Sequence, residues 1–308
     1  MKKCLILSTS KEFSSEKVQE LTKNMEVTWK KYDKITETEL LSELSFDKWD
    51  ILAISPDPLE WLIPESFYQN IGTIKNICLP TTSHECFDIT RLKKLGITLS
   101  NIPHYSTNAV AEWALLMMMG LLRKLPEQIK TSFEHKYSDE NLGEEFTGKT
   151  VGIIGLGTIG NRIAQILQNL GMKVIYWSKT SRNEKYEFVS LEELLKNADF
   201  IFPTYKINDE TKGFLDKDKL QLIKPQGKII NIAGETAWDN EFVLRMVAEK
   251  KIEGVAFEST KIKMVDQTGN VLILPPLGWY TKESQIRTFE IWYSNILSCL
   301  DGEPQNLV

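Results

Sequence analysis

The stretch TVGIIGLGTIGNRIAQILQNLGMKVIYW, from Thr150 to Trp177, decides the fold expected for this chain. Its two apolar ends, TVGII and KVIYW, have the length and the β-branched content of buried strands. Between them, Ile163, Leu167 and other apolar residues recur at helical spacing, and Gly171 stands where such a helix would end. A strand, a helix and a second strand in this order predict a parallel α/β sheet.

The turn between this strand and the helix has the spacing G-x-G-x-x-G, formed by Gly155, Gly157 and Gly160. The first glycine permits a tight turn, the second lets backbone N–H groups approach a pyrophosphate, and the third lets the helix pack on the strand. Thr158 and Ile159 open the helix, whose positive end suits an anion. The sequence therefore predicts a dinucleotide-binding turn, and a glycine-rich turn without a ligand is the alternative.

The residues after the second strand indicate which dinucleotide is bound. A carboxylate about 20 residues after the glycines commonly holds the ribose of NAD. This chain instead has Ser178, Lys179 and Arg182 at the end of the strand. Because a hydroxyl and two cations suit a 2′-phosphate, we expect NADP(H) rather than NAD(H). A solvated basic loop without this role is the alternative.

The first hundred residues also alternate between strand and helix patterns. Thr36 and Glu39 have capping-box spacing at the start of one predicted helix. This alternation predicts a second, smaller parallel α/β domain. The predicted strands cover residues 4–8, 26–32, 49–55, 74–80 and 96–101, and the predicted helices cover residues 14–24 and 36–44.

The segments on either side of the glycine turn extend these patterns. We expect one long apolar helix over residues 106–133 and a charged, solvated loop over 133–149 that contains His135. Ser190 and Glu193 have the spacing of a helix cap. Further predicted strands cover residues 200–205, 227–233, 252–258 and 270–274.

The last predicted helix begins near Ser284 and is stopped by Gly302 and Pro304. Its expected apolar face consists of Ile286, Phe289, Trp292 or Tyr293, Ile296 and Leu300.

Composition places the chain among ordinary globular proteins. Its 308 residues suggest two domains, and 42% hydrophobic residues can form sizeable cores. The net charge of −5 is spread evenly, which argues against a nucleic-acid partner. No run approaches the ~20 apolar residues of a membrane helix, and the apolar run in MKKCLILSTS is too short for a signal peptide.

The cysteines and histidines do not predict a metal centre. The four cysteines, Cys4, Cys78, Cys86 and Cys299, include no C-x-x-C pair, and the three histidines are scattered. We expect reduced, buried thiols in a cytoplasmic protein, and no metal.

Several segments resemble the D-2-hydroxyacid dehydrogenase family, in particular its glyoxylate and hydroxypyruvate reductases. They are the entry into the long helix at Asn108–Glu112, the dinucleotide segment at 148–174, and the segments LIKPQGKIINIA and LGWYTKES. The resemblance implies a flavodoxin-like substrate domain, residues 1–102 plus 284–308, with parallel strands. It implies an inserted dinucleotide-binding Rossmann domain, residues 103–283, a ligand cleft at the junction and a homodimer.

The same resemblance identifies three departures at the positions of the reaction. In the family an arginine binds the substrate carboxylate, a histidine transfers the proton and a glutamate orients that histidine. Here Gly234, Pro276 and Lys263 occupy those positions in turn. Glu258 fills an acidic position that can hold the nicotinamide amide. None of these three replacements can supply the chemistry of the family's residue in the usual way.

Three functions follow as hypotheses. The first is an NAD(P)-binding protein without the usual 2-hydroxyacid dehydrogenase activity, which acts as a sensor, a regulator or a partner subunit. The second is an active NADP(H)-dependent oxidoreductase that uses relocated residues on a 2-oxo acid, a ketone or an imine. The third is a structural dimer whose glycine turn is a relic, and it predicts no dinucleotide binding.

The second hypothesis needs substitutes for the absent residues. His84 or Tyr280 could transfer a proton, and Lys261 or Lys263 could bind an anion. Each has a plainer interpretation: a surface loop histidine, solvated lysines, and a tyrosine ring packed against Trp279. A substrate without a carboxylate would suit the absence of the arginine better than a 2-oxo acid.

Overall fold

The computed structural model describes residues 1–8, 15–132, 139–264 and 267–308, so His135 lies outside the described residues. The chain forms two compact units, a first unit of residues 1–105 with 282–308 and a second unit of residues 106–281. The domain boundaries expected from the sequence lie within three residues of these. Each unit holds one parallel sheet, which confirms the predicted α/β class with two domains.

The first unit has a five-stranded sheet in the order β2-β1-β3-β4-β5, and every neighbouring pair is parallel. Each strand lies at, or within one residue of, a stretch predicted from the sequence. The strands are β1 (Lys3–Ser8), β2 (Glu26–Lys31), β3 (Ile51–Ile54), β4 (Asn76–Cys78) and β5 (Thr98–Ser100). The helices are α1 (Ser15–Leu21), α2 (Glu37–Ser45), η1 (Asp57–Leu59), α3 (Glu65–Asn70), α4 (Ile89–Lys94) and α11 (Lys282–Leu300).

Helices cover both faces of this sheet. Leu40, Phe67 and Leu92 from α2, α3 and α4 belong to the core on one face. Leu21 from α1 and Trp292 from α11 belong to the core on the other face. Burial on both faces explains why the strands are almost continuously apolar instead of alternating.

The face that α11 buries differs from the predicted one. Ile286 is 54% exposed, whereas Thr288 and Asn295 are buried. Thr288 Oγ1 donates to the Ser284 carbonyl oxygen at 3.0 Å, and Asn295 Nδ2 donates to the Asn101 carbonyl oxygen at 2.8 Å. The prediction was wrong at the start of the helix because hydrogen-bonded polar side chains can be buried, and a pattern of apolar residues does not reveal them.

The second unit has a seven-stranded, wholly parallel sheet in the order β12-β11-β10-β9-β6-β7-β8. Only the two-residue edge strand β8 lies outside the stretches predicted as strands. The strands are β6 (Thr150–Ile154), β7 (Lys173–Trp177), β8 (Glu187–Phe188), β9 (Phe200–Pro203), β10 (Lys228–Asn231), β11 (Gly254–Glu258) and β12 (Asn270–Leu274). The helices are α5 (Thr107–Leu122), α6 (Leu125–Ser132), η2 (Asp139–Asn141), α7 (Thr158–Asn169), α8 (Leu191–Asn197), α9 (Lys217–Leu220) and α10 (Asn240–Ala248).

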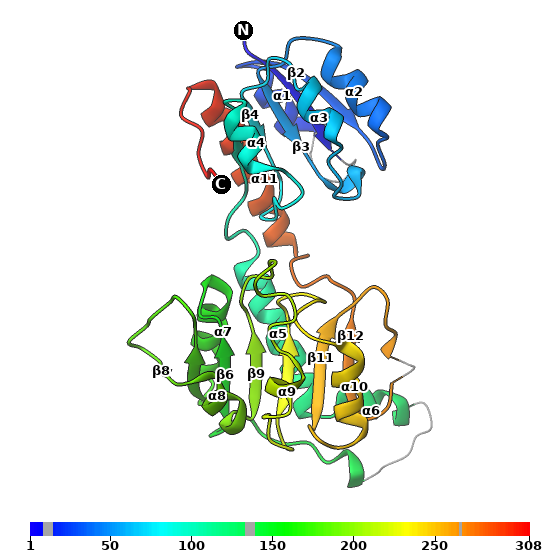
Figure 1. The fold of residues 1–308 in the computed structure, drawn as a ribbon, viewed down its shortest axis with the longest axis vertical. Helices are drawn as coiled ribbons and strands as arrows, with labels where there is room; N and C mark the ends of the chain where they lie inside the picture. The colour runs from blue at the N-terminus through cyan, green and yellow to red at the C-terminus, as the bar shows by residue number, and fades with distance from the viewer. Residues whose placement is uncertain (9–14, 133–138, 265–266) are drawn as a thin grey trace. The chain divides into compact units, whose positions relative to one another are not determined.

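This larger sheet also lies between two helical layers. Figure 1 shows α9 and α10 in front of the strands and α5 behind them. Met117 and Leu121 of α5 share one core with Ile163 of α7, and Leu194 of α8 shares the other core with Val243 of α10. None of the described helices has the length and apolar content needed to cross a bilayer.

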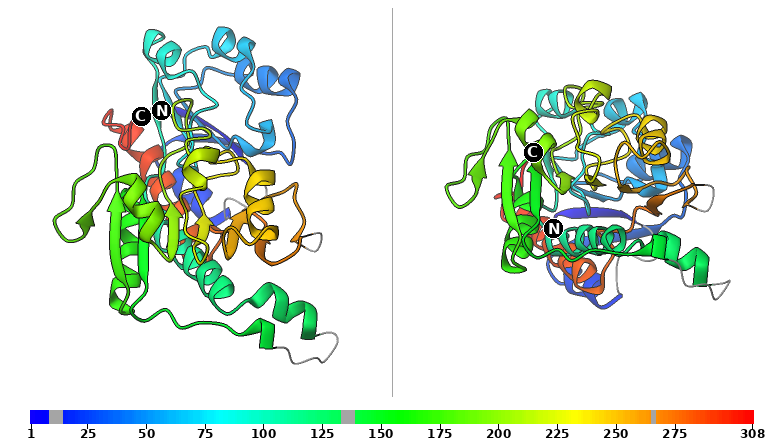
Figure 2. Two further views of the ribbon diagram at one scale, coloured as in Figure 1. Left: turned by 60° about the horizontal axis from the view of Figure 1, so that its bottom comes forward. Right: turned by 90° about the horizontal axis from the view of Figure 1, so that it is seen from below.

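The sequence pattern predicts one helix over residues 106–133, but the structure has two, α5 and α6 (Figure 2). The break falls at Lys124, whose φ of +49° is left-handed. Pro126 follows, and a proline lacks the N–H for a helical hydrogen bond and disfavours helical backbone at the residue before it. The prediction was wrong because it gave the apolar run more weight than this proline.

The predicted helix ends agree with the structure. Thr36 and Glu39 form the reciprocal bonds of a capping box at α2. Ser190 Oγ accepts the Glu193 backbone N–H at 3.1 Å at the start of α8. Gly171, with φ +88°, closes α7 with the paired backbone bonds of a Schellman motif.

Candidate functional site

The glycine turn between β6 and α7 is fixed by close packing. Gly155 has φ +94°, and a Cβ there would lie 2.9 Å from the backbone N of Tyr205. A Cβ on Gly160 would overlap the Gly155 carbonyl oxygen and lie 2.6 Å from Thr204 Oγ1. Thr204 Oγ1 also donates to the Gly155 carbonyl oxygen. Neither glycine can be replaced without a shift of the surrounding backbone.

Gly157 differs from the other two glycines because packing within the chain does not explain it. A Cβ there would meet no atom within 4 Å, and its φ of −79° suits any residue. It is the N-cap of α7 and makes no side-chain cap. The first N–H groups of a helix carry partial positive charge and need acceptors. The open space at Gly157 therefore fits a pyrophosphate that approaches these N–H groups.

The turn lies where the strand order of the sheet reverses. From β6 the chain continues on one side to β7 and β8, and on the other side to β9, β10, β11 and β12. In open parallel sheets, ligands bind at the carboxyl ends of the strands at such a point. The Gly155 N–H donates to the Trp177 carbonyl oxygen at 2.8 Å, which joins the turn to the end of β7.

The loop after β7 contains the residues predicted to select the dinucleotide. Ser178 is buried, and its Oγ accepts the Ser181 backbone N–H at 3.1 Å. Arg182 Nη1 donates to the carbonyl oxygens of Ser178 and Ser181, both at 2.9 Å. Lys179 is exposed and lies 3.3 Å from the Glu210 carboxylate. Arg182 therefore shapes the loop in addition to carrying positive charge.

The carboxyl ends of β10, β11 and β12 enclose a cavity of about 210 Å³. Because these strands are parallel to β6, the cavity and the glycine turn lie at the same edge of the sheet. Three of its residues stand at positions that the sequence resemblance assigns to the reaction or the nicotinamide. The lining residues are Asn231, Gly234, Glu235, Glu258, Thr260 and Pro276.

The backbone at Gly234 disfavours any side chain, including an arginine. Its φ is +137°, a conformation that side chains rarely adopt. Asn231 closes the turn, since its Nδ2 donates to the Gly234 carbonyl oxygen and its Oδ1 accepts the Ala233 N–H, both at 2.9 Å. A Cβ on Gly234 would meet only Ile207 at 3.6 Å, so the constraint comes from the backbone and not from lack of space.

Glu258 is held against the segment that follows β12. Its Oε1 accepts the Gly278 N–H at 2.9 Å. Burial raises the pKa of Glu258, and the Gly278 N–H and the Trp113 side chain act against that rise. Trp113 Nε1 is buried, and none of the described residues accepts from it in good hydrogen-bond geometry. A Cβ on Gly278 would lie 2.8 Å from Trp113 Cδ1, so this position requires a residue without a side chain.

Glu235 is a second carboxylate in the cavity, and the sequence analysis did not single it out. Its Oε1 accepts the Thr260 backbone N–H at 3.0 Å. The available signal was an acidic residue directly after the glycine at a strand end. That signal was missed because the comparison concerned the absent arginine one position earlier.

The residues suggested as substitutes lie apart from this cavity or in the other unit. His84 belongs to the first unit, and its Nδ1 lies 3.3 Å from the Thr82 carbonyl oxygen. Lys263 is exposed, and Tyr280 is 55% exposed with its ring edge-on to Trp279 at 5.2 Å. Neither Lys263 nor Tyr280 is among the described residues that line the cavity.

All four cysteines are free thiols, and Cys78 Sγ lies 3.7 Å from Cys299 Sγ inside the first unit. Within the described ranges, no group of three or more His, Cys, Asp or Glu side chains could hold a metal ion.

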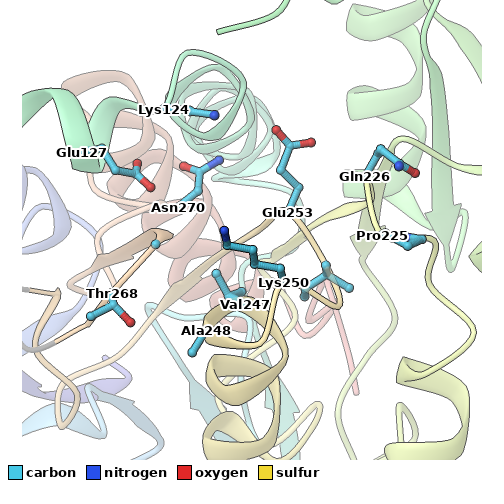
Figure 3. Close-up of a pocket in the computed structure, with 12 residues that line it drawn as sticks. Lys124, Glu127, Pro225, Gln226, Val247, Ala248, Lys250, Glu253, Thr268 and Asn270 are labelled. Carbon is cyan, nitrogen blue, oxygen red and sulfur yellow. The ribbon is translucent and has the colours of Figure 1, made fainter. Parts of the chain in front are cut away.

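A larger cavity, of about 580 Å³, lies at the opposite, amino edge of the same three strands. Residues that precede β10, β11 and β12 line it together with the turn between α5 and α6. Figure 3 shows its polar side chains, which include Lys124, Glu127, Lys250, Glu253 and Asn270. It cannot serve a dinucleotide bound at the glycine turn, because that turn is at the other edge of the sheet.

The parallel sheet, its reversal point and the glycine turn define a dinucleotide-binding α/β protein. The family model described as "D-isomer specific 2-hydroxyacid dehydrogenase, NAD binding domain" matches residues 115–275. The chain therefore belongs to the D-isomer specific 2-hydroxyacid dehydrogenase family, which confirms the resemblance found in the sequence.

Named relatives cover most of the chain. A glyoxylate reductase of Thermococcus litoralis is 28% identical over 295 residues, which is 90% of this chain and 85% of that protein. A hydroxypyruvate reductase of Blautia hydrogenotrophica is 28% identical over 297 residues, which is 90% of each.

Solved structures share the whole fold. An acyclic imino acid reductase in complex with NADPH and D-Arg has a TM-score of 0.88 and 26% identity, and the match covers 99% of both chains. A glyoxylate reductase from Paecilomyes thermophila also has a TM-score of 0.88, with 21% identity over 100% of this chain and 98% of that one. At that lower identity the second likeness supports the fold alone.

Proposed function

We propose that this protein is an NADP(H)-dependent reductase that does not use the family's 2-oxo acid chemistry. The observation that carries the proposal is the position of the glycine turn and the cavity at Asn231, Gly234 and Glu258. Both lie at the carboxyl edge of one sheet. A dinucleotide bound at Gly157 would extend along this edge, from the reversal point toward the ends of β10 and β11.

The preference for NADP(H) rests on the loop after β7. Residues 178–183 include Ser178, Lys179 and Arg182 and no carboxylate. The cations suit a 2′-phosphate, and the buried serine suits a ribose or phosphate oxygen. The solved imino acid reductase, which resembles this chain along its whole length, was crystallised with NADPH. We therefore assign the adenosine end of the dinucleotide to this loop.

The residues that line the cavity do not suit a 2-oxo acid substrate. Gly234 cannot bind a carboxylate through a side chain, and Pro276 cannot transfer a proton. The named glyoxylate and hydroxypyruvate reductases act on substrates that carry a carboxylate. A ketone or an imine without a carboxylate fits the cavity better. The solved imino acid reductase is named for a C=N substrate that carries a carboxylate, so it supports the imine group and not the absence of a carboxylate.

The residues of this chain have separate tasks in such a reaction. The nicotinamide, when bound, supplies the hydride. The backbone N–H groups at Gly157 and Thr158 hold the pyrophosphate. Glu258 accepts from the nicotinamide amide while its Oε1 keeps the Gly278 N–H. Trp113 and Gly278 pack beside this carboxylate and limit its access to water.

The test is a titration with NADPH and NADH followed by turnover assays. We expect NADPH to quench tryptophan fluorescence at lower concentration than NADH. We then expect NADPH oxidation with ketones or imines and none above background with glyoxylate or hydroxypyruvate. Rapid reduction of glyoxylate by the unmodified chain would contradict the proposal.

Binding of the dinucleotide without turnover is a second candidate function, favoured by Pro276 in the position of the proton donor. It predicts the same NADPH titration and no NADPH oxidation with any carbonyl or imine.

The proposals for relocated catalytic groups remain His84, Lys263 and Tyr280. A homodimer in the cytoplasm remains a prediction. Alanine variants of the three residues would identify any that turnover requires.

A further inference from the structure

The cavity at the ends of β10, β11 and β12 is negatively charged. Its ionisable lining residues are Glu235 and Glu258, and no lysine or arginine lines it in the described part of the chain. The position that the sequence resemblance gives to the family's cation is occupied by Gly234, whose φ of +137° disfavours any side chain. The charge of this part of the edge is therefore opposite to the one that a substrate carboxylate needs.

Glu235 is held by the protein in a defined place. Its Oε1 accepts the Thr260 N–H at 3.0 Å, and Thr260 lies two residues beyond the end of β11. A carboxylate offers about four lone-pair sites, so Glu235 can accept further donors from a ligand. The neighbouring Glu258 has the position proposed to hold the nicotinamide amide. This leaves Glu235 as the carboxylate for the substrate.

The electrostatic consequence is that a positive charge would be stabilised in the cavity. Burial raises the pKa of Glu258, because the ionised carboxylate loses contact with water. A cation near both carboxylates would offset that penalty, whereas the carboxylate of a 2-oxo acid would add a third negative charge.

The proton chemistry of an iminium also suits this cavity. Hydride transfer to a carbonyl produces an alkoxide, which needs a proton donor, and Pro276 is not one. Hydride transfer to an iminium carbon forms a C–H bond and moves the C=N π electron pair to nitrogen. The product is a neutral amine, NADPH becomes NADP⁺, and no proton is needed in that step.

We infer that the substrate's reacting centre is a cationic iminium and that Glu235 binds it in the place where the family uses an arginine for an anion. This deepens the proposed reductase function and depends on it. A carbonyl compound, an amine and a proton form such an iminium by condensation with release of water. The substrate class is thus an imine derived from an amine.

The first experiment uses the full chain with cyclohexanone, with cyclohexanone plus methylamine, with pyruvate, and with pyruvate plus methylamine. NADPH oxidation is followed by absorbance. We expect the fastest turnover with cyclohexanone plus methylamine, and cyclohexanone alone should be at least about 100-fold slower. Pyruvate plus methylamine should also be slower than cyclohexanone plus methylamine, because its carboxylate adds a negative charge beside Glu235 and Glu258. Equal or faster reduction of cyclohexanone alone overturns the inference.

The second experiment changes the charge of Glu235. Glu235→Gln keeps an acceptor for the Thr260 N–H but loses the charge, and we expect kcat/KM for the iminium to fall about tenfold or more. The matched control is Glu241→Gln, an exposed glutamate in the first turn of α10. Glu235→Arg should abolish iminium turnover and permit glyoxylate to bind. A Glu235→Gln variant with unchanged kcat/KM overturns the inference.

Two further readouts separate this inference from the proposed function. NADPH affinity should stay unchanged in Glu235→Gln, and the unfolding midpoint shows that the variant folds.

The outcomes of the assays distinguish the two proposals. If NADPH binds and a neutral ketone is reduced while iminiums are not, the inference about Glu235 fails and the proposed reductase function is kept. If no arm oxidises NADPH, the proposed function itself fails. Binding of N-methylcyclohexylammonium with NADP⁺ should also weaken in Glu235→Gln, and equal binding to both proteins contradicts the role of Glu235.

Discussion

The carboxyl edge of the large sheet has two halves that differ in the residues at their strand ends. At the ends of β6 and β7, the backbone excludes side chains at Gly155 and Gly160 and leaves Gly157 open. At the ends of β10 to β12, Gly234 and Pro276 stand where the sequence resemblance places the family's arginine and histidine, and two carboxylates line the cavity. The first half suits a dinucleotide, whereas for the second half we propose a different substrate.

The difference teaches that the backbone of the second half, like that of the first, is held in place by specific contacts. Gly234 has a left-handed backbone that Asn231 fixes with two hydrogen bonds, and Gly278 makes room for Trp113 beside Glu258. The ends of β10 to β12 thus form an ordered arrangement with its own requirements.

The largest expected effect distinguishes two glycines of the first half. In Gly160→Ala the new Cβ overlaps the Gly155 carbonyl oxygen, so we expect a loss of about 3 kcal/mol in the free energy of unfolding and no NADPH binding. In Gly157→Ala the fold keeps its stability, because the Cβ meets nothing, but NADPH binds at least about tenfold more weakly. Urea unfolding and fluorescence titration measure both. Wild-type NADPH affinity in Gly157→Ala would remove the reason for placing the pyrophosphate there.

The second expected effect concerns the other half of the edge. Gly234→Arg introduces the residue that the sequence resemblance places there. A side chain on the backbone at φ +137° should lower the free energy of unfolding by about 1–3 kcal/mol, and we expect no glyoxylate reduction. Gly234→Ala is the matched control, since it carries the same backbone penalty without the charge. A stable Gly234→Arg protein that reduces glyoxylate would show that the two halves differ only by a lost side chain.

A smaller effect is expected in the loop after β7. Arg182→Ala should weaken NADPH binding about tenfold, or about 1.4 kcal/mol, and leave NADH binding almost unchanged. The exposed Lys185, three residues further along, serves as the control in Lys185→Ala. If both dinucleotides weaken equally, Arg182 only shapes the loop through its bonds to Ser178 and Ser181.

The smallest effect is a pH dependence from Glu258. Its pKa is raised by burial in the folded chain, so between the unfolded pKa of about 4.3 and the folded pKa the native state binds more protons than the unfolded state. Stability from this group therefore falls as pH rises through that window. Glu258→Gln should show a smaller fall, measured by urea unfolding at a series of pH values. Identical slopes in both proteins would mean that the cavity does not desolvate this carboxylate.

Sequence reasoning predicted what local backbone chemistry determines. The glycine turn, the capping box at Thr36 and the helix end at Gly171 depend on a few neighbouring residues, and all three are in the structure. The break between α5 and α6 was also visible in Pro126, but the long apolar run concealed it.

Features that depend on distant contacts could not be predicted. The buried Asn295 of α11 donates to the carbonyl oxygen of Asn101, a partner that the helix pattern does not identify. The role proposed for Glu235 depends on the Thr260 N–H, which comes from the end of another strand. A sequence can name the residue at a strand end, but only the folded sheet shows which charges share a cavity.

The unequal size of the two cavities has a practical consequence for fragment screening. The space of about 580 Å³ at the amino edge, beside Lys250 and Asn270, can accept more compounds than the space of about 210 Å³ beside Glu235. A hit detected only by a rise in melting temperature would often belong to the larger space and leave turnover untouched. Inhibitor discovery on this protein should therefore begin with displacement of NADPH.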